Sequence, residues 1–152
     1  MTGKLSMTSA FIALVALLLG AAVTSSSAAT TKTLRFTTPG SQLVLHRVDT
    51  GNKGPTLGDM LIINGPLHKK GGAIAGNFYF TCTVVKLHPH KQHCVGTFVV
   101  SGGQITSQGV LGMNPPATFA LTGGTGAYQT TRGHVDIGGT RQLTVTTLHL
   151  IL

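Results

Sequence analysis

The chain has 152 residues, of which 41% are hydrophobic and only 9% are charged, and its formal net charge is +8 at pH 7. An average soluble domain has about 25% charged residues, so the polarity of this chain comes mainly from glycine, threonine and serine. Its 21 glycines and 23 threonines exclude a coiled coil and favour an all-β protein. At this length a single domain buries enough surface to fold without a metal or a dense disulfide scaffold.

The first 28 residues have the pattern of a secretory signal peptide. Lys4 precedes an apolar run over residues 11–23, and residues 26–28 (Ser-Ser-Ala) are the small residues that signal peptidase requires. A membrane anchor is the alternative, but it needs about 20 apolar residues, whereas this run has 13. We therefore expect a secreted, extracellular protein whose mature chain begins near Ala29 and has no membrane span.

Eight runs of apolar and β-branched residues follow, separated by short turns that contain Gly, Pro or Asn. Residues 29–41 are a Thr-rich lead-in that we place outside the domain. The predicted strands are residues 42–48, 59–67, 73–86, 94–101, 104–111, 117–121, 132–137 and 141–152. Short turns favour antiparallel neighbours, and eight such strands commonly close into a barrel with room for one small ligand. We predict a single eight-stranded antiparallel β-barrel over 42–152, with a sandwich as the alternative.

Two cysteines in a secreted chain suggest a disulfide. Cys82 and Cys94 lie in neighbouring predicted strands, joined by the polar segment LHPHKQH. A hairpin centred on His88 places the two cysteines directly opposite each other, close enough to bond. We expect this bond to be a structural staple, because nothing in the sequence supplies a base to activate a thiol.

Other chemical motifs are weak. The run TGGTGAY over residues 122–128 is not a dinucleotide-binding loop, because no helical pattern follows it. His88, His90 and His93 have no flanking acid, and the thiols that could complete a zinc site are expected to be oxidised. No nucleic-acid motif accompanies the basic residues. We expect no cofactor, no metal and no nucleic acid.

Residues 103–135, GQITSQGVLGMNPPATFALTGGTGAYQTTRGHV, resemble the C-terminal half of the allene oxide cyclase-like and dirigent-like barrel superfamily. The shared order is a G-x-I-x-x-Q-G strand, an apolar strand, a GGTG turn and an Arg-Gly pair. Leu57-Gly58-Asp59 is similar to the start of the superfamily's second strand, and the resemblance extends from about Gln42 onward. It implies an eight-stranded barrel with an apolar cavity, often assembled as a homotrimer.

The resemblance also implies positions for charged pocket groups, and this chain departs from them. The first-strand carboxylate of allene oxide cyclases falls on His46 or Arg47, and the chain contains no Glu. The first-strand Asp of dirigent proteins falls on Arg47, and their Asp after GGTG falls on Ala127. Their Arg in the Arg-Gly pair is retained as Arg132. The implied pocket is cationic and apolar.

An apolar wall is predicted for this pocket. Two pocket tyrosines of dirigent proteins fall on Phe78 and Phe80, which share one strand face with Val84. Phe98 and Val100 share one face of the next strand. The alternative is that these side chains simply fill a closed core.

The predicted function is a secreted barrel that binds an apolar small molecule and steers its cyclisation or coupling. The candidate catalytic residues are His46, Arg47 and Arg132, and any enzyme activity would be of the isomerase, cyclase or dirigent type. The alternative is a non-catalytic interaction protein that binds anionic polysaccharide or cell envelope through basic patches at residues 69–70 and 86–93.

Overall fold

The computed structural model describes residues 29–51, 53–112 and 116–152. The predicted signal peptide, residues 1–28, lies outside the described residues. Within the described ranges, no helix has the length and apolar character needed to cross a membrane.

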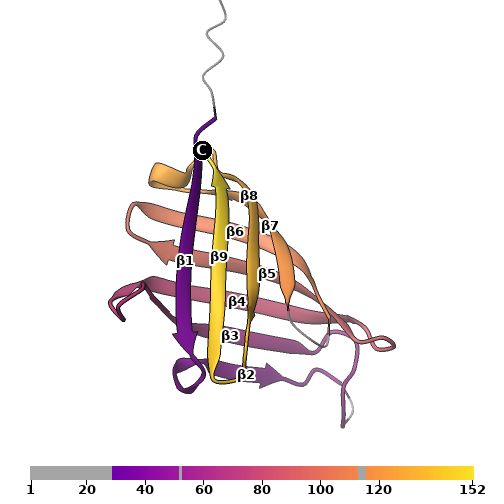
Figure 1. The fold of residues 1–152 in the computed structure, drawn as a ribbon. Helices are drawn as coiled ribbons and strands as arrows, with labels where there is room; N and C mark the ends of the chain where they lie inside the picture. The colour runs from indigo at the N-terminus through magenta and orange to yellow at the C-terminus, as the bar shows by residue number, and fades with distance from the viewer. Residues whose placement is uncertain (1–28, 52, 113–115) are drawn as a thin grey trace, which may run out of the picture.

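The described part of the chain forms nine strands and two short 3-10 helices (Figure 1). These are β1 (Thr31–Pro39), η1 (Gly40–Gln42), β2 (Val44–Val48), β3 (Met60–His68), β4 (Ile74–Lys86), β5 (Lys91–Val100), β6 (Gly103–Leu111), β7 (Ala117–Gly124), η2 (Gly126–Tyr128), β8 (Arg132–Gly139) and β9 (Leu143–Ile151). Each strand from β3 to β9 pairs antiparallel with the strand before it, as the short turns between them require.

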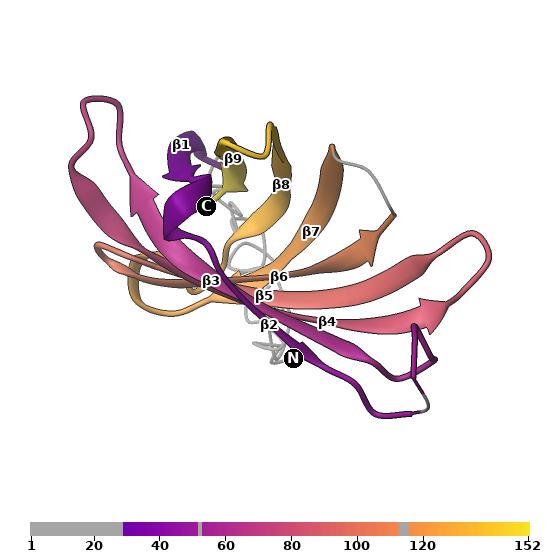
Figure 2. The same ribbon diagram turned by 90° about the horizontal axis from the view of Figure 1, so that it is seen from below.

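The sheet closes into a barrel because β1 pairs with two strands, β9 along its whole length and β3 at Thr37↔His68. β2 continues the pairing with β3, so β1 and β2 together fill one position in the ring. The nine strands therefore make the eight-stranded antiparallel barrel that the sequence predicted. Figure 2 shows its two walls, β1, β9, β8 and β7 facing β2 to β6.

β1 differs from the sequence prediction, which left residues 29–41 outside the domain. All nine residues of β1 have partners on β9. Phe36 and Thr38 point into the barrel and are buried. Threonine is a good strand former, but this run has few large apolar side chains. Its alternation of apolar and polar residues is therefore too weak to predict a strand from the sequence.

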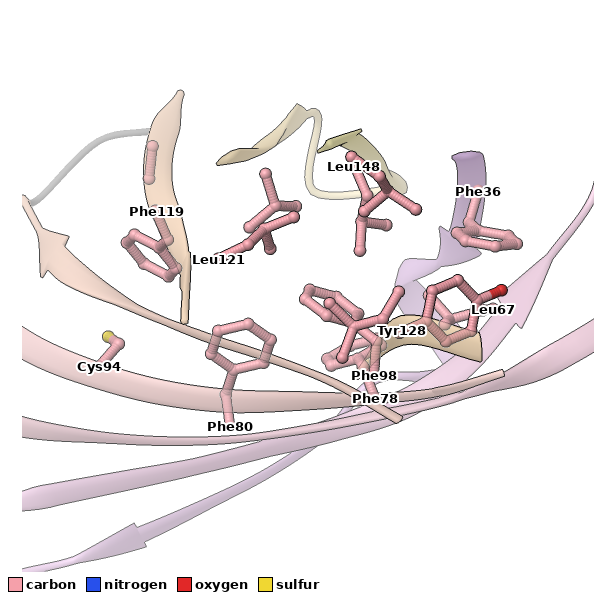
Figure 3. Close-up of a cluster of buried hydrophobic side chains, with 14 of the residues drawn as sticks. Phe36, Leu67, Phe78, Phe80, Cys94, Phe98, Phe119, Leu121, Tyr128 and Leu148 are labelled. Atoms are coloured by element: carbon pink, nitrogen blue, oxygen red, sulfur yellow. The ribbon is translucent and has the colours of Figure 1, made fainter. Parts of the chain in front are cut away.

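Inward-pointing residues of the strands form one hydrophobic core (Figure 3). Phe80 lies at the centre of an aromatic group, with ring centroids 5.4 Å from Phe98, 5.8 Å from Phe119 and 6.0 Å from Phe78. The tilted and edge-on ring contacts are those that aromatic pairs prefer. The other large buried members are Phe36, Leu67, Ile105, Leu121, Tyr128, Val135, Leu148 and Leu150.

The GGTG motif closes the end of the barrel beside the C-terminus (Figure 1). Gly126 has φ of +60°, and a Cβ there would overlap the carbonyl oxygen of Gly102. This conformation and this close approach both require glycine. The turn leads into Tyr128, whose buried ring joins the core and whose hydroxyl donates to the Ser101 carbonyl at 3.1 Å. The glycines of this motif therefore have a structural role.

Cys82 and Cys94 form the predicted disulfide. They are directly paired residues of β4 and β5, in the register that a hairpin centred on His88 requires. Both sulfur-bearing side chains are buried, at 1% and 0% exposure. The prediction of this bond is confirmed.

Candidate functional site

An apolar cavity of about 190 Å³ lies between the two walls of the barrel, at the end away from η2. An apolar cavity of about 150 Å³ is large enough to hold benzene, so this one is sized for a ligand portion with one or a few rings. No ionisable side chain occurs among the described residues that line it. The lining consists of Leu43, Leu45, Ile63, Phe78, Phe80, Cys82, Cys94, Phe98, Leu111, Ala117, Phe119, Ile137, Thr144 and Thr146.

Two glycines keep this space open. A Cβ on Gly96 would overlap the ring of Phe80, and a Cβ on Gly109 would overlap the ring of Phe119. Each ring therefore lies against bare backbone of the neighbouring strand instead of standing out into the cavity. Close packing elsewhere leaves few voids in a protein interior, so a cavity between such rings depends on these positions.

The mouth of the cavity is on the β2 side, where the lining residue Leu45 is 61% exposed. Arg47 is two residues further along β2 and therefore on the same face of the strand as Leu45. It pairs with Leu61, which pairs with the lining residue Cys82. A shallow hollow beside the mouth is lined by Arg47, His90 and other residues. The structure thus places one guanidinium on the cavity side of the barrel, at its open end.

His46 and Arg132 are not in the cavity lining. His46 is exposed and pairs with Ile62, on the opposite face of the strand from Arg47. Arg132 is exposed at the start of β8, while the lining residue Ile137 lies toward the other end of that strand. Val135, which is fully buried, shares the inward face of β8 with Ile137, so the even-numbered Arg132 faces outward. The expectation that Arg132 lines the cavity is therefore corrected.

The predicted apolar wall lies partly in the lining. Phe78, Phe80 and Phe98 all line the cavity. Val84 is buried on the same face of β4 but borders the hollow beside the mouth. Val100 is half-buried and packs against the core without reaching the cavity.

Asp59 fixes the β2–β3 loop at the mouth. Its carboxylate accepts hydrogen bonds from the backbone N–H groups of Thr56 and Thr50, at 2.8 and 3.0 Å. It also accepts from their hydroxyl groups, at 2.8 and 3.2 Å. These bonds, the Thr56 N–H first among them, lower the pKa of Asp59 to about 2. The acid of the Leu57-Gly58-Asp59 motif therefore stabilises a loop.

Sequence reasoning missed much of the lining, which comes from β2, β3, β6, β7, β8 and β9 and from the residue just before β2. Strand alternation could have found Phe119 and Ile137, because each lies within a predicted strand. It could not say which face of those strands points inward until the registers were known. The lining residues that were missed are Leu43, Leu45, Ile63, Leu111, Ala117, Phe119, Ile137, Thr144 and Thr146.

Comparison with known proteins gives structural relatives but no sequence family. No family model and no curated protein matches the chain. A pyocyanin demethylase is 27% identical, with a TM-score of 0.65 over 80% of this chain and 99% of that one. The pterocarpan synthase dirigent protein GePTS1 is 16% identical, with a TM-score of 0.60 over 80% of this chain and 88% of that one. The Diels-Alderase AbmU from Streptomyces koyangensis is 15% identical, with a TM-score of 0.65 over 78% and 63%.

The fold is a closed antiparallel β-barrel similar to those of a dirigent protein and of a Diels-Alderase, and it encloses an apolar cavity. The resemblance to the allene oxide cyclase-like and dirigent-like superfamily is confirmed at the level of the fold. Among the described residues, none of those that line the cavity has an ionisable side chain, and Arg47 borders the hollow beside the mouth.

Proposed function

We propose that the protein is a secreted barrel that binds a planar apolar small molecule and steers its cyclisation or coupling by holding one conformer. The observation that carries this proposal is an apolar cavity that is open at one end and has a wall of four phenylalanine rings, Phe78, Phe80, Phe98 and Phe119. An apolar pocket with few polar groups is the usual form of a small-molecule site. Fixing the geometry of a reactive molecule is itself an effective way to speed one reaction path.

The energetics of the site are dominated by apolar contact. Burying roughly 200 Å² of apolar ligand surface is worth about 5 kcal/mol at 25 cal/mol per Å², before the entropic cost of association. This leaves little net affinity for a ligand held by shape alone. A polar contact at the mouth would therefore be a substantial part of the net free energy of binding.

Arg47 is the proposed polar partner. Its guanidinium is always charged and has five N–H donors, which suit a carboxylate, phenolate or carbonyl oxygen. Among the described residues the ion pairs all involve Asp136, so no such pair neutralises Arg47. A ligand with a flat apolar body and an oxygen-bearing end would place its body against the phenylalanines and its oxygen near Arg47.

The structural relatives support the class of ligand. By their names, one relative acts on pyocyanin, one is a pterocarpan synthase and one is a Diels-Alderase. Each name describes chemistry on a small organic molecule.

Two further features belong to this proposal. The Cys82–Cys94 disulfide is typical of proteins exposed to an oxidising compartment, which supports secretion. The outer face of β3 to β5 exposes Ile62, Tyr79 and Val95, at 36%, 52% and 50%. An apolar outer face supports the homotrimer that the superfamily resemblance implies, and native mass spectrometry of the secreted protein tests both the trimer and the shortened chain.

The alternative function is binding to an anionic polymer through basic patches, and the fold supports it less. Lys69 and Lys70 lie in the turn before β4, and the segment 86–93 lies at the far end of β4. A strand of 13 residues separates the two groups of cations, so they do not form one continuous surface.

The test uses two matched substitutions on β7. Ala117 lines the cavity and Ala120 is exposed on the outer face of the same strand. Ala117→Phe should fill the cavity and weaken binding of 2-naphthoate and of pyocyanin by at least tenfold, whereas Ala120→Phe should bind both as the native protein does. Calorimetry and absorbance titrations measure the affinities, and thermal melts show that both variants fold.

The outcomes separate the two functions. Equal binding by both variants would overturn the cavity proposal. Salt-sensitive retention on heparin, lost in Lys69→Ala with Lys70→Ala and unaffected by Ala117→Phe, would support the polymer function in its place. Mass spectrometry of small molecules that copurify with the secreted protein would then identify the native ligand class.

A further inference from the structure

A cluster of two histidines and one aspartate lies on the outer surface of the barrel, away from the cavity. His134 and Asp136 are on β8, and His149 is the direct partner of His134 on β9. One ligand atom from each residue lies within 4.8 Å of the other two. Within the described ranges this is the one place where three metal-ligating side chains gather in this way.

The distances suit a tetrahedral metal ion. The Asp136 Oδ2 lies 3.7 Å from His134 Nε2 and 3.4 Å from His149 Nε2. Zinc is bound by nitrogen and oxygen atoms about 2.0 to 2.2 Å away, so two ligands of a tetrahedral zinc are roughly 3.3 to 3.6 Å apart. The two carboxylate-to-imidazole distances are therefore already close to those of a zinc site.

The two imidazole rings must turn to bind one ion. They stack with centroids 4.5 Å apart and planes 17° from parallel. Because each nitrogen lone pair lies in the plane of its ring, rotation about the side-chain bonds must take the rings out of this stack before both Nε2 atoms point at one ion. Both side chains are partly exposed, at 49% and 40%, so solvent leaves room for this rotation.

The carboxylate is held in the required orientation. The hydroxyl group of Thr118 on β7 donates a hydrogen bond to Asp136 Oδ1, at 2.6 Å. This leaves Oδ2 turned toward both histidines. A hydrogen bond of this kind to the second oxygen of a ligating carboxylate is a regular feature of metal sites, because it fixes the ligand and tunes its basicity.

The surrounding residues leave the cluster accessible to a metal ion but lower its affinity for a divalent cation. The residues paired beside it on the same face are small, namely Thr33, Ala120 and Thr147. Arg132 precedes His134 by two residues on that face, and Arg35 pairs with Thr147. Both are cations that raise the electrostatic cost of placing a divalent ion here. Micromolar affinity is therefore expected rather than the tighter binding of a closed structural site.

We propose that His134, Asp136 and His149 bind one Zn²⁺ ion on the outside of the barrel. Three protein ligands leave the fourth tetrahedral position for water or for a donor from another molecule. The site lies on the solvent side of β8 and β9, so it is independent of what the cavity binds.

The experiment is a zinc titration of the untagged secreted protein by calorimetry, with competition against a chromogenic chelator. One ion should bind per chain. His149→Asn and Asp136→Asn should each weaken binding at least tenfold, whereas the matched control His46→Asn should leave it unchanged, since His46 is an exposed histidine on β2 far from the cluster. Thermal melts check that each variant folds.

A second measurement avoids substitutions in the site. Co²⁺ bound to the native protein should give the intense visible bands of a tetrahedral complex, and added Zn²⁺ should displace it. The hairpin histidines are tested by the triple substitution of His88, His90 and His93 by Asn, which should leave binding unchanged. Loss of binding in that triple variant, unchanged binding in both site variants, or an octahedral cobalt spectrum would overturn the proposal.

Discussion

The ring of Phe80 lies over the backbone of Gly96, its direct partner on the neighbouring strand. The pair explains why a glycine interrupts an otherwise apolar strand at that position. The shape of the cavity therefore depends on the absence of a side chain at residue 96, because any larger residue there would have to displace an aromatic ring of the lining.

Gly96→Ala should therefore reduce both the cavity and the stability of the barrel. The added methyl group would push Phe80 toward the centre of the cavity, where the ligand is proposed to lie. Overpacking of this kind typically costs about 1 to 3 kcal/mol of unfolding free energy. Urea denaturation measures the stability, and calorimetry with 2-naphthoate measures the loss of binding.

Gly138→Ala is the matched control for that experiment. Gly138 is also a strand glycine, but a Cβ there would meet only Pro116 at an ordinary 3.7 Å. It should change stability by less than about 0.5 kcal/mol, as surface substitutions usually do. Equal effects of the two substitutions would show that Gly96 is not special.

The Cys82–Cys94 bond should contribute roughly 2 to 3 kcal/mol to stability in the loop-entropy description of a short closed loop. Intact-mass measurement should show the loss of two hydrogens. Replacing both cysteines by alanine should lower the unfolding free energy by that amount. Because both cysteines line the cavity, the double variant should also accept bulkier ligands than the native protein. Free thiols in folded, secreted protein would contradict the prediction.

The disulfide was predictable because hairpin register follows from simple symmetry. A turn centred on His88 fixes which residue of β4 faces which residue of β5. The same reasoning applied to the turn between β8 and β9 would have paired His134 with His149. That cluster was missed because the two histidines are distant in sequence and no spacing motif marks them.

The charged residues of the site were harder to predict than the fold. Arg47 and His46 are adjacent, so they face opposite sides of β2, and only the pairing of β2 with β3 decides which one faces the cavity. Family resemblance favoured Arg132, but the alternation of β8 turns it outward. A one-residue uncertainty in strand register is enough to exchange a pocket residue for a surface residue.

Asp59 should make the stability depend on acid pH. Its pKa is lowered to about 2 in the folded protein from an ordinary value of 3.8, so folding favours the ionised carboxylate. The resulting stabilisation is present above about pH 4 and is lost as the pH falls toward 2. Thermal midpoints measured between pH 5 and pH 2 should fall less in Asp59→Asn than in the native protein over that window.

Asp49→Asn is the control for the pH experiment. Asp49 accepts one hydrogen bond, from the Gly51 N–H at 3.1 Å, in the same loop but on the exposed side. The native pH dependence should persist in this variant. If Asp59→Asn and the native protein lose stability in parallel below pH 4, the carboxylate network does not stabilise the loop in the way described.

Arg47 should be the cation that recognises a charged ligand, and Arg132 should not. Arg47 shares the cavity-facing side of β2 with Leu45, while Arg132 faces solvent on the outer side of β8. Because Arg47 is exposed, water and salt screen its interaction, and its contribution should be about 1 to 2 kcal/mol, or roughly 5- to 30-fold in affinity. Arg47→Ala should weaken 2-naphthoate binding by that factor, with little effect on the uncharged naphthalene-2-methanol. Arg47→Lys should restore only part of the affinity, because lysine lacks the planar fork.

Arg132→Ala should bind both compounds as the native protein does. Calorimetry at low and high salt measures all three variants, and a loss of naphthoate affinity in Arg132→Ala but not in Arg47→Ala would reverse the assignment.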